Sequence, residues 1–91
     1  MENKLIAVEE FCTYHHIEFT FLESLSEFGL IELVPVENNR FLQEEQLKDI
    51  ERMIRLHYDL DINMAGIDAI SHLLKRMDAL QQEIRMLKNG M

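Results

Sequence analysis

The sequence predicts a mainly helical fold: two short helices, a small β-hairpin, and then two longer helices. Three observations support it. Residues 8–14 and 18–28 carry apolar side chains at helical spacing with only a short break between them, which is typical of a helix-turn-helix. Residues 31–42 hold two apolar stretches on either side of two asparagines. Residues 64–89 repeat apolar side chains every three or four positions, as a long helix does. Together these features predict a winged helix-turn-helix with a C-terminal coiled-coil helix.

The first third of the chain contains the predicted helix-turn-helix. Leu5-Ile6 is expected to form a short edge strand ahead of the first helix, and His15-His16 is expected to break the chain between the helices. In the second helix one face is apolar, and it consists of Phe21, Leu22, Leu25 and Phe28. Gly29 follows directly, in the position where glycine commonly ends a helix.

The middle of the chain is expected to form the wing and a third helix. Residues 31–36 read as a strand, and Pro35 confines it to the edge of a sheet. Asn38-Asn39 is expected to form the turn, and residues 40–42 the returning strand. Residues 43–60 then read as one amphipathic helix, with apolar positions at Leu47, Ile50, Met53, Ile54 and His57.

The last helix, residues 64–89, begins after Asn63, a good N-cap residue. Its apolar positions are spaced 3, 4, 3, 4, 3, which is a coiled-coil stripe: Ile70, Leu73, Met77, Leu80, Ile84 and Leu87. We expect this stripe to form a homodimer, because so long a helix would overhang so small a domain; the alternative is that it packs back onto its own domain. Residues 1–63 are thus expected to be the winged domain, and residues 64–91 a dimerisation helix of the same compact unit.

Composition limits the class of protein. The 91 residues are 47% hydrophobic and 29% charged, with one proline and three glycines, as in a folded globular domain. No run approaches the roughly 18 apolar residues of a membrane span, and no signal peptide is expected at the N-terminus. Cys12 is the only cysteine, so no internal disulfide can form, which fits the cytoplasm.

The charge is unevenly distributed. The formal net charge is -8, and residues 1–39 contribute -7 of it, because they hold eight glutamates and only Lys4. Nucleic-acid binders depend on lysine and arginine for most of their affinity, so DNA is disfavoured as a partner. An acidic surface suits a basic protein instead, although acidity also simply keeps a protein soluble.

The sequence gives little support for catalysis, a metal or a cofactor. Cys12, His15 and His16 form a Cys-x-x-His-His cluster, but no second ligand pair follows at zinc-site spacing. The same cluster offers a cysteine–histidine nucleophile pair, but nothing marks an oxyanion hole beside it. The glycines are scattered, so no phosphate-binding loop is present. We therefore expect a non-enzymatic protein without metal or cofactor, in which Cys12 is a small core residue.

The order of elements resembles that of the MerR superfamily. Residues 27–31 are similar to the exit of that family's second helix, and residues 39–47 to its wing and the start of the next helix. DNA-binding members usually carry an Arg-Tyr-Tyr-type cluster on the second helix, where this chain has Leu22-Glu23-Ser24. They also carry a second arginine after the wing, where this chain has Leu42-Gln43. Both departures remove phosphate contacts.

Within that superfamily the chain is similar to the CbpM family of chaperone modulators. The resemblance rests on residues 8–12, 29–32, 55–67 and 80–83, of which residues 55–67 are the most specific. It implies a protein that binds the J-domain of a CbpA-like co-chaperone and prevents it from stimulating a DnaK-type chaperone. A J-domain presents a basic helix, which an acidic inhibitor would cover, and complementary charge speeds such an encounter.

The partner-binding surface is expected around the first two helices, because no lysine or arginine occurs between residues 5 and 39. Its candidate residues are Glu10, Glu18, Phe19, Glu23 and Glu27; the alternative is that these acids form an ordinary solvated helix face. Two other functions stay open. One is a dimeric MerR-type DNA-binding regulator that uses Arg40, Lys48, Arg52 and Arg55 as phosphate contacts. The other is an adaptor of the same fold with an unrelated protein partner.

Overall fold

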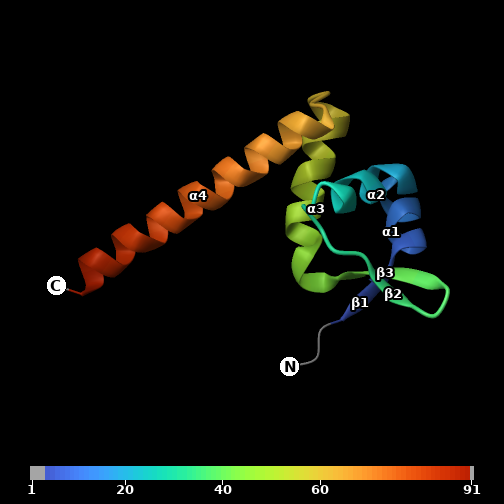
Figure 1. Cartoon of the computed structure of the whole chain (residues 1–91), viewed down its shortest axis with the longest axis horizontal. Coiled ribbons are helices and arrows are strands. Elements are labelled where there is room, and N and C mark those ends of the chain that lie inside the picture. The colour runs from blue at the N-terminus through green and yellow to red at the C-terminus, as the bar shows by residue number, and fades with distance from the viewer. Residues whose placement is uncertain (1–3, 91) are drawn as a thin grey trace.

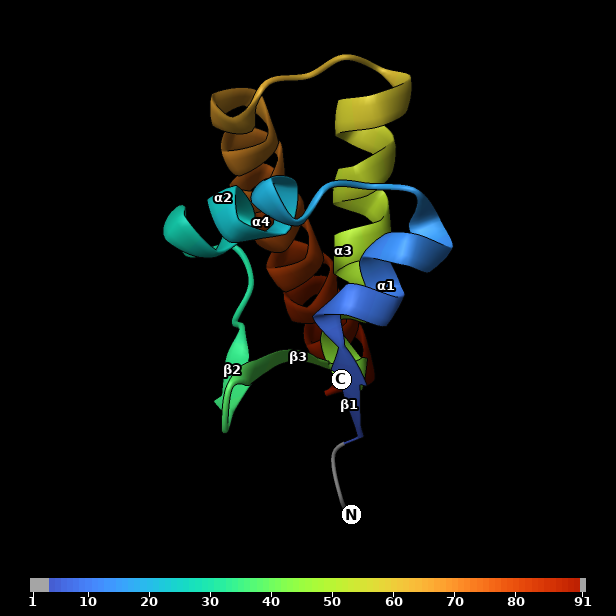
Figure 2. The same ribbon diagram turned by 90° about the vertical axis from the view of Figure 1, so that its right-hand side faces the viewer.

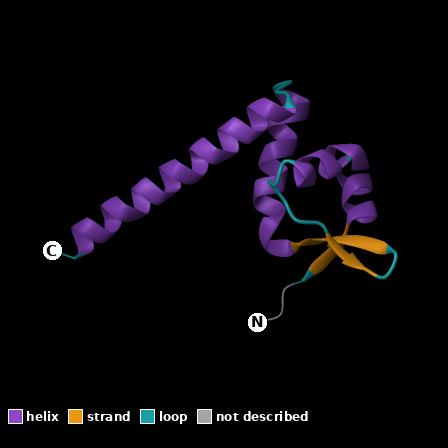
Figure 3. Ribbon diagram, viewed as in Figure 1, coloured by secondary structure: helices purple, strands orange, loops and turns teal. Residues whose placement is uncertain are grey.

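The computed structural model describes residues 4–90, in which helices and a three-stranded sheet follow one another in the order expected for a winged helix-turn-helix (Figures 1 and 3). The elements are β1 (Leu5–Ala7), α1 (Val8–His15), α2 (Phe19–Glu27), β2 (Val34–Val36), β3 (Asn39–Gln43), a 3-10 turn (Glu44–Gln46), α3 (Leu47–Ile54), a π-helical segment (Arg55–Asp59) and α4 (Met64–Asn89). Within this range the mainly helical prediction is confirmed.

Helices α1 and α2 form the helix-turn-helix. His16 ends α1 in a left-handed conformation with φ 56°, and the Ile17 N–H donates to the Cys12 carbonyl at 3.0 Å, so the chain reverses within a few residues. Both helices turn apolar side chains inward, and Leu22 and Leu25 are fully buried. Gly29 follows α2 with φ 76°, a conformation that glycine adopts without strain, and so ends the helix as expected.

The three strands form one antiparallel sheet in the order β1-β3-β2. Leu5 to Ala7 pair with one side of β3, and β2 pairs with the other. Pro35 therefore lies on an edge strand, as its missing N–H predicts. Leu42 of β3 has no exposed surface. Its side chain packs among the apolar side chains of the helices, so the sheet and the helices share one core.

Two details of the predicted wing are wrong. The strand expected over residues 31–36 is confined to Val34–Val36, because Ile31 turns into the core and is 7% exposed. The turn lies one residue earlier than expected, at Glu37 and Asn38, while Asn39 pairs with Val36 at the start of β3. Glu37 adopts the positive φ, 58°, that the asparagines were expected to supply.

The helix expected over residues 43–60 is not uniform. Residue 43 belongs to β3, and the helical run that follows begins as a 3-10 turn, continues as α3 and widens into a π-helical segment. In that segment the His57 ring stacks on Phe21 with centroids 4.8 Å apart, and the Tyr58 ring meets Phe21 edge-on at 5.4 Å. The wider turn brings two consecutive aromatic side chains onto one core ring, a packing need that helix periodicity does not reveal.

Helix α4 leaves the winged domain and runs away from α1 and α2 (Figure 1). Asn63 caps it as expected, its side chain accepting a hydrogen bond from the Gly66 N–H at 2.8 Å. Ile67 and Ser71 are buried against the domain and Met64 packs against its core, whereas residues 75–90 are exposed. At 1.5 Å per residue its 26 residues span about 39 Å, and the molecule extends 52 × 36 × 21 Å.

Candidate protein-binding site

The outer face of α2 is acidic with one aromatic side chain. Phe19, Glu23 and Glu27 are four residues apart, so they lie along one side of the helix. Phe19 is 36% exposed, Glu27 is exposed and Glu23 is half-buried. We call these three residues the α2 face. Figure 2 views the molecule from the side on which α1 and α2 lie, with α4 behind them.

The wing brings one cation to the α2 face. The Arg40 guanidinium carbon lies 5.1 Å from the centroid of the Phe19 ring, in a cation–π contact. The same side chain approaches Glu23, with Nη1 3.6 Å from Oε2. Both partners of the ion pair are about half exposed, so its stabilising contribution is small. Its main effect is to occupy this arginine with a carboxylate of its own chain.

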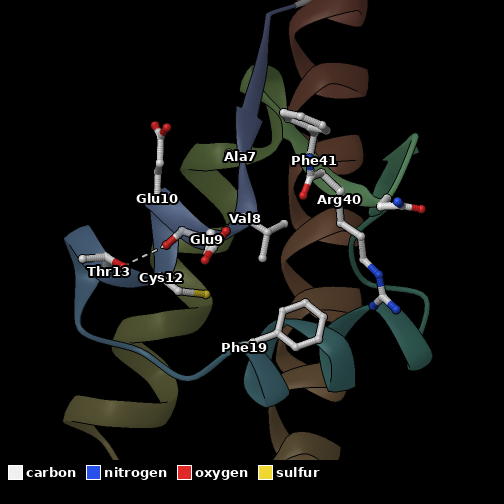
Figure 4. A pocket seen from close by; sticks show the side chains of 11 residues that line it. Ala7, Val8, Glu9, Glu10, Cys12, Thr13, Phe19, Arg40 and Phe41 are labelled. Carbon is white, nitrogen blue, oxygen red and sulfur yellow. Dashed lines mark hydrogen bonds between the residues drawn. The ribbon is translucent and has the colours of Figure 1, made fainter.

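A pocket of about 520 Å³ lies between α1, the start of α2 and the wing (Figure 4). Val8, Cys12, Phe19 and Phe41 supply apolar surface to it. Figure 4 shows the Phe19 ring at one end of the pocket, directed toward Arg40. The pocket can therefore accept an apolar side chain next to the acidic groups of α1 and α2.

The five candidate residues from the sequence do not all meet. Glu10 touches the rim of the pocket, but its side chain points away from Phe19 (Figure 4), toward two shallower hollows that Tyr14 also lines. Glu18 is used locally: its carboxylate accepts from the Thr20 hydroxyl at 3.3 Å, and its N–H donates to the Tyr58 hydroxyl at 3.4 Å. Only the α2 face combines three of the candidates.

Three residues beside the α2 face were not among the candidates: Val8, Arg40 and Phe41. Arg40 was considered only as a phosphate contact, and its contacts with Phe19 and Glu23 depend on how the wing folds over α2. Val8 and Phe41 read as ordinary apolar positions. No local signal in the sequence shows that they would meet around a pocket.

The other basic residues proposed as phosphate contacts lie elsewhere. Lys48 and Arg52 line a hollow between α3 and α4. In Figure 1, α4 extends on the side of α3 away from α1. Arg55 is exposed at the start of the π-helical segment. Among residues 4–90, Arg40 is thus the one member of this set that contacts the α2 face.

From Leu73 onward the stripe residues of α4 lie on a side of the helix that does not face the domain. Ile70 is half-buried, and Leu73, Met77, Leu80, Ile84 and Leu87 are between 52% and 68% exposed. The contact with the winged domain is made instead by Ile67 and Ser71, one turn apart on another face. The stripe therefore does not pack back onto its own domain and leaves a contiguous apolar surface without a partner in the described part of the chain.

Cys12 and His15 make packing contacts with neighbouring side chains. Cys12 is half-buried against the core, and burial raises the pKa of its thiol above the ordinary value of 9.0. His15 lies between the Phe11 and Tyr14 rings, and its Nε2 is 3.7 Å from a carboxylate oxygen of Glu51. Within residues 4–90 no three histidine, cysteine or acidic side chains are grouped so that they could hold a metal ion.

The helix-turn-helix with its wing and long final helix places the molecule in the winged helix-turn-helix class. A family model described as "MerR HTH family regulatory protein" matches residues 6–89, nearly the whole chain, and the chain belongs to this family. Comparisons with curated proteins and with solved structures gave no match. None of the helices in the described range is long and apolar enough to span a membrane.

Proposed function

We propose that this chain is a non-enzymatic, protein-binding member of the MerR family. In this proposal it covers the basic helix of a J-domain in a CbpA-like co-chaperone and so prevents stimulation of a DnaK-type chaperone, as the CbpM-like sequence features imply. The observation that carries the proposal is the α2 face, where Phe19 shares one side of the helix with Glu23 and Glu27, and where Arg40 is paired with Glu23. A single free thiol, Cys12, fits action in the reducing cytoplasm.

The charge of the α2 face argues against DNA as the main partner. In helix-turn-helix proteins the second helix enters the major groove, between two phosphate backbones. Glu23 and Glu27 on this helix would be repelled there, and DNA affinity depends on neutralising phosphates with lysine and arginine. Arg40, the cation at this face, already lies against Glu23 and would have to exchange that contact for a phosphate.

A basic amphipathic helix matches the same surface. One apolar side chain of such a helix fits the pocket between Val8, Phe19 and Phe41, while lysines and arginines on its flanks meet Glu23 and Glu27. The central apolar anchor would supply most of the affinity, and the surrounding charges would speed association and select the partner. The partner chemistry that follows is a helix with one apolar residue among basic ones.

Dimerisation completes the proposal. The exposed α4 stripe has the 3, 4 spacing of a coiled-coil seam, and burying it needs a second helix of the same pattern. A second copy of this chain carries the same apolar stripe on its own α4, and most soluble oligomers are assembled from identical chains. Because α4 runs away from α1 and α2, such a dimer leaves both copies of the α2 face free to bind.

An ATPase assay tests this function. A DnaK-type chaperone is stimulated with its CbpA-like co-chaperone, and the purified chain is added in increasing amounts. We expect stimulation to fall to the basal rate, and the Glu23→Lys, Glu27→Lys double variant to inhibit at least tenfold less strongly at equal concentration. The Glu44→Lys, Glu45→Lys double variant is the matched control, since it makes the same change of charge at two exposed acids that precede α3, away from the α2 face. Undiminished stimulation by the co-chaperone at saturating chain would contradict the proposal.

A MerR-type DNA-binding regulator is the second candidate, because the family match and the α2–wing arrangement are those of a DNA-binding scaffold. The two functions respond oppositely to Arg40→Gln. Loss of this arginine removes a phosphate contact and weakens DNA binding, whereas it frees Glu23 for a basic protein partner. Fluorescence anisotropy with a labelled duplex, run beside J-domain binding, separates them.

A further inference from the structure

A second recessed site lies between α3 and α4. Helix α4 extends on the side of α3 away from α1 (Figure 1). The site has a volume of about 630 Å³ and is lined by α3 with the 3-10 turn before it, by residues 71–81 of α4, and by Leu30 and Ile31. It contains none of the α2 face residues. We call it the α3–α4 hollow.

Two residues that line this hollow each carry a buried polar side-chain atom that lacks a hydrogen-bond partner among residues 4–90. Ser71 lines the hollow with a side chain that is only 3% exposed, and its hydroxyl makes no hydrogen bond. Arg52 also lines it, and its buried Nε–H is likewise without an acceptor, although Nη2 donates to Asp49 at 3.1 Å. A buried donor without a partner is costly, so folded proteins seldom retain one unless something else satisfies it.

The charge around these donors favours an anion. Lys48 and Lys75 stand on the two helices that wall the hollow, and with Arg52 they give three positive side chains. The two acids there are Asp49, which is already paired with Arg52, and Asp78. The formal charge of the hollow is therefore +1, in a chain whose net charge is -8.

We propose that the α3–α4 hollow binds a small molecule bearing an oxyanion, a phosphate or a carboxylate. In the free chain the Arg52 Nε–H and the Ser71 hydroxyl are closed to solvent. In this proposal both side chains turn toward the hollow when the oxyanion binds and donate to one of its oxygens, and Lys48 and Lys75 neutralise the remaining charge. Arg52 belongs to α3 and Ser71 to α4, so the bound molecule bridges the two helices. The site is separate from the α2 face and does not depend on the protein-binding proposal.

Nuclear magnetic resonance titration of the full chain tests the site. Inorganic phosphate is added in one series and succinate in another, with sodium chloride adjusted to keep the ionic strength constant. We expect saturable shifts of the Arg52 Nε–H signal and of the amides of Lys48, Ser71 and Lys75, with no shift at Phe19. The two series decide which oxyanion is preferred.

Variants assign the contacts. Arg52→Gln should weaken binding at least tenfold and Ser71→Ala several-fold, while both variants keep the wild-type spectrum elsewhere. Arg85→Gln removes the same charge from an exposed position outside the hollow and should bind as the wild type does. Shifts that stay linear with both anions, or that survive Arg52→Gln unchanged, would overturn the proposal.

Discussion

The guanidinium group of Arg40 lies over the ring of Phe19, 5.1 Å from its centroid, so that the wing rests against the first turn of α2. Glu23 lies one turn further along α2, and its Oε2 is 3.6 Å from Nη1 of the same guanidinium group. The contact links the two parts of a winged helix-turn-helix that usually contact DNA together. In this chain it places an acid and an aromatic ring where a DNA-binding protein needs free cations.

Arg40→Gln should therefore strengthen binding to a basic protein partner. The change leaves Glu23 unpaired and makes the chain more acidic, which raises the association rate about twofold at low salt. The free energy of unfolding should fall by less than about 1 kcal/mol, because the ion pair and the cation–π contact are both exposed. Stopped-flow association with a J-domain measures the rate, and a slower rate in the variant would argue that Arg40 itself contacts the partner.

Asn63→Ala should destabilise the start of α4. The Asn63 side chain accepts the Gly66 N–H at 2.8 Å, and loss of such a cap costs about 1 kcal/mol. Asn63→Asp keeps an acceptor at the same position and serves as the control. Urea unfolding followed by circular dichroism measures both variants. Equal stabilities of wild type and Asn63→Ala would show that the cap contributes nothing.

The exposed stripe of α4 should hold two copies of the chain together. Leu80→Glu combined with Ile84→Glu places charge at the centre of the proposed seam, and we expect this double variant to be monomeric in analytical ultracentrifugation when the wild type is dimeric. Ala79→Glu introduces the same residue at an exposed neighbouring position outside the stripe and should leave the dimer intact. A wild-type chain that sediments as a monomer at micromolar concentration would contradict the seam.

Cys12 should react slowly with thiol reagents in the folded protein. Burial raises the pKa of its thiol, so the fraction present as reactive thiolate at pH 8 is lower than in a free cysteine. The neutral thiol stabilises the fold below the ordinary pKa of 9.0, and this contribution is lost as the pH rises through the higher pKa of the folded state. Iodoacetamide labelling at pH 8, followed by mass spectrometry, should be markedly faster in urea than in buffer. Equal rates would place the thiol at the surface.

Helix periodicity predicted the architecture well. The apolar spacing in residues 8–28 indicated the two short helices, and Gly29 and Asn63 marked the end of one helix and the start of another, because the backbone groups at helix ends impose residue preferences that can be read locally. Pro35 likewise predicted an edge strand from the absence of its N–H. These features depend on residues close together in the chain.

The misplaced details depend on distant residues. Ile31 reads as a strand residue, but its side chain is buried in the hydrophobic core and the residue lies outside the sheet. The widening at Arg55–Asp59 follows from the packing of His57 and Tyr58 on Phe21, more than thirty residues away. At the candidate site, the four-residue spacing of the acids predicted an acidic side of α2. The contact between Arg40 and Phe19 could not be predicted in this way, because it forms only when the wing folds against α2. Glu10 and Glu18 carry the same charge as the acids of the α2 face, but their side chains are not part of that face.

The central claim is that the α2 face binds a basic protein helix, and a calorimetric titration tests it most directly. The purified chain is titrated with the J-domain of a CbpA-like co-chaperone at two salt concentrations, about 50 and 300 mM. We predict saturable binding that weakens at the higher salt, because complementary surface charges are screened there. No detectable heat of binding at either salt concentration, with tight binding to a DNA duplex instead, would contradict it.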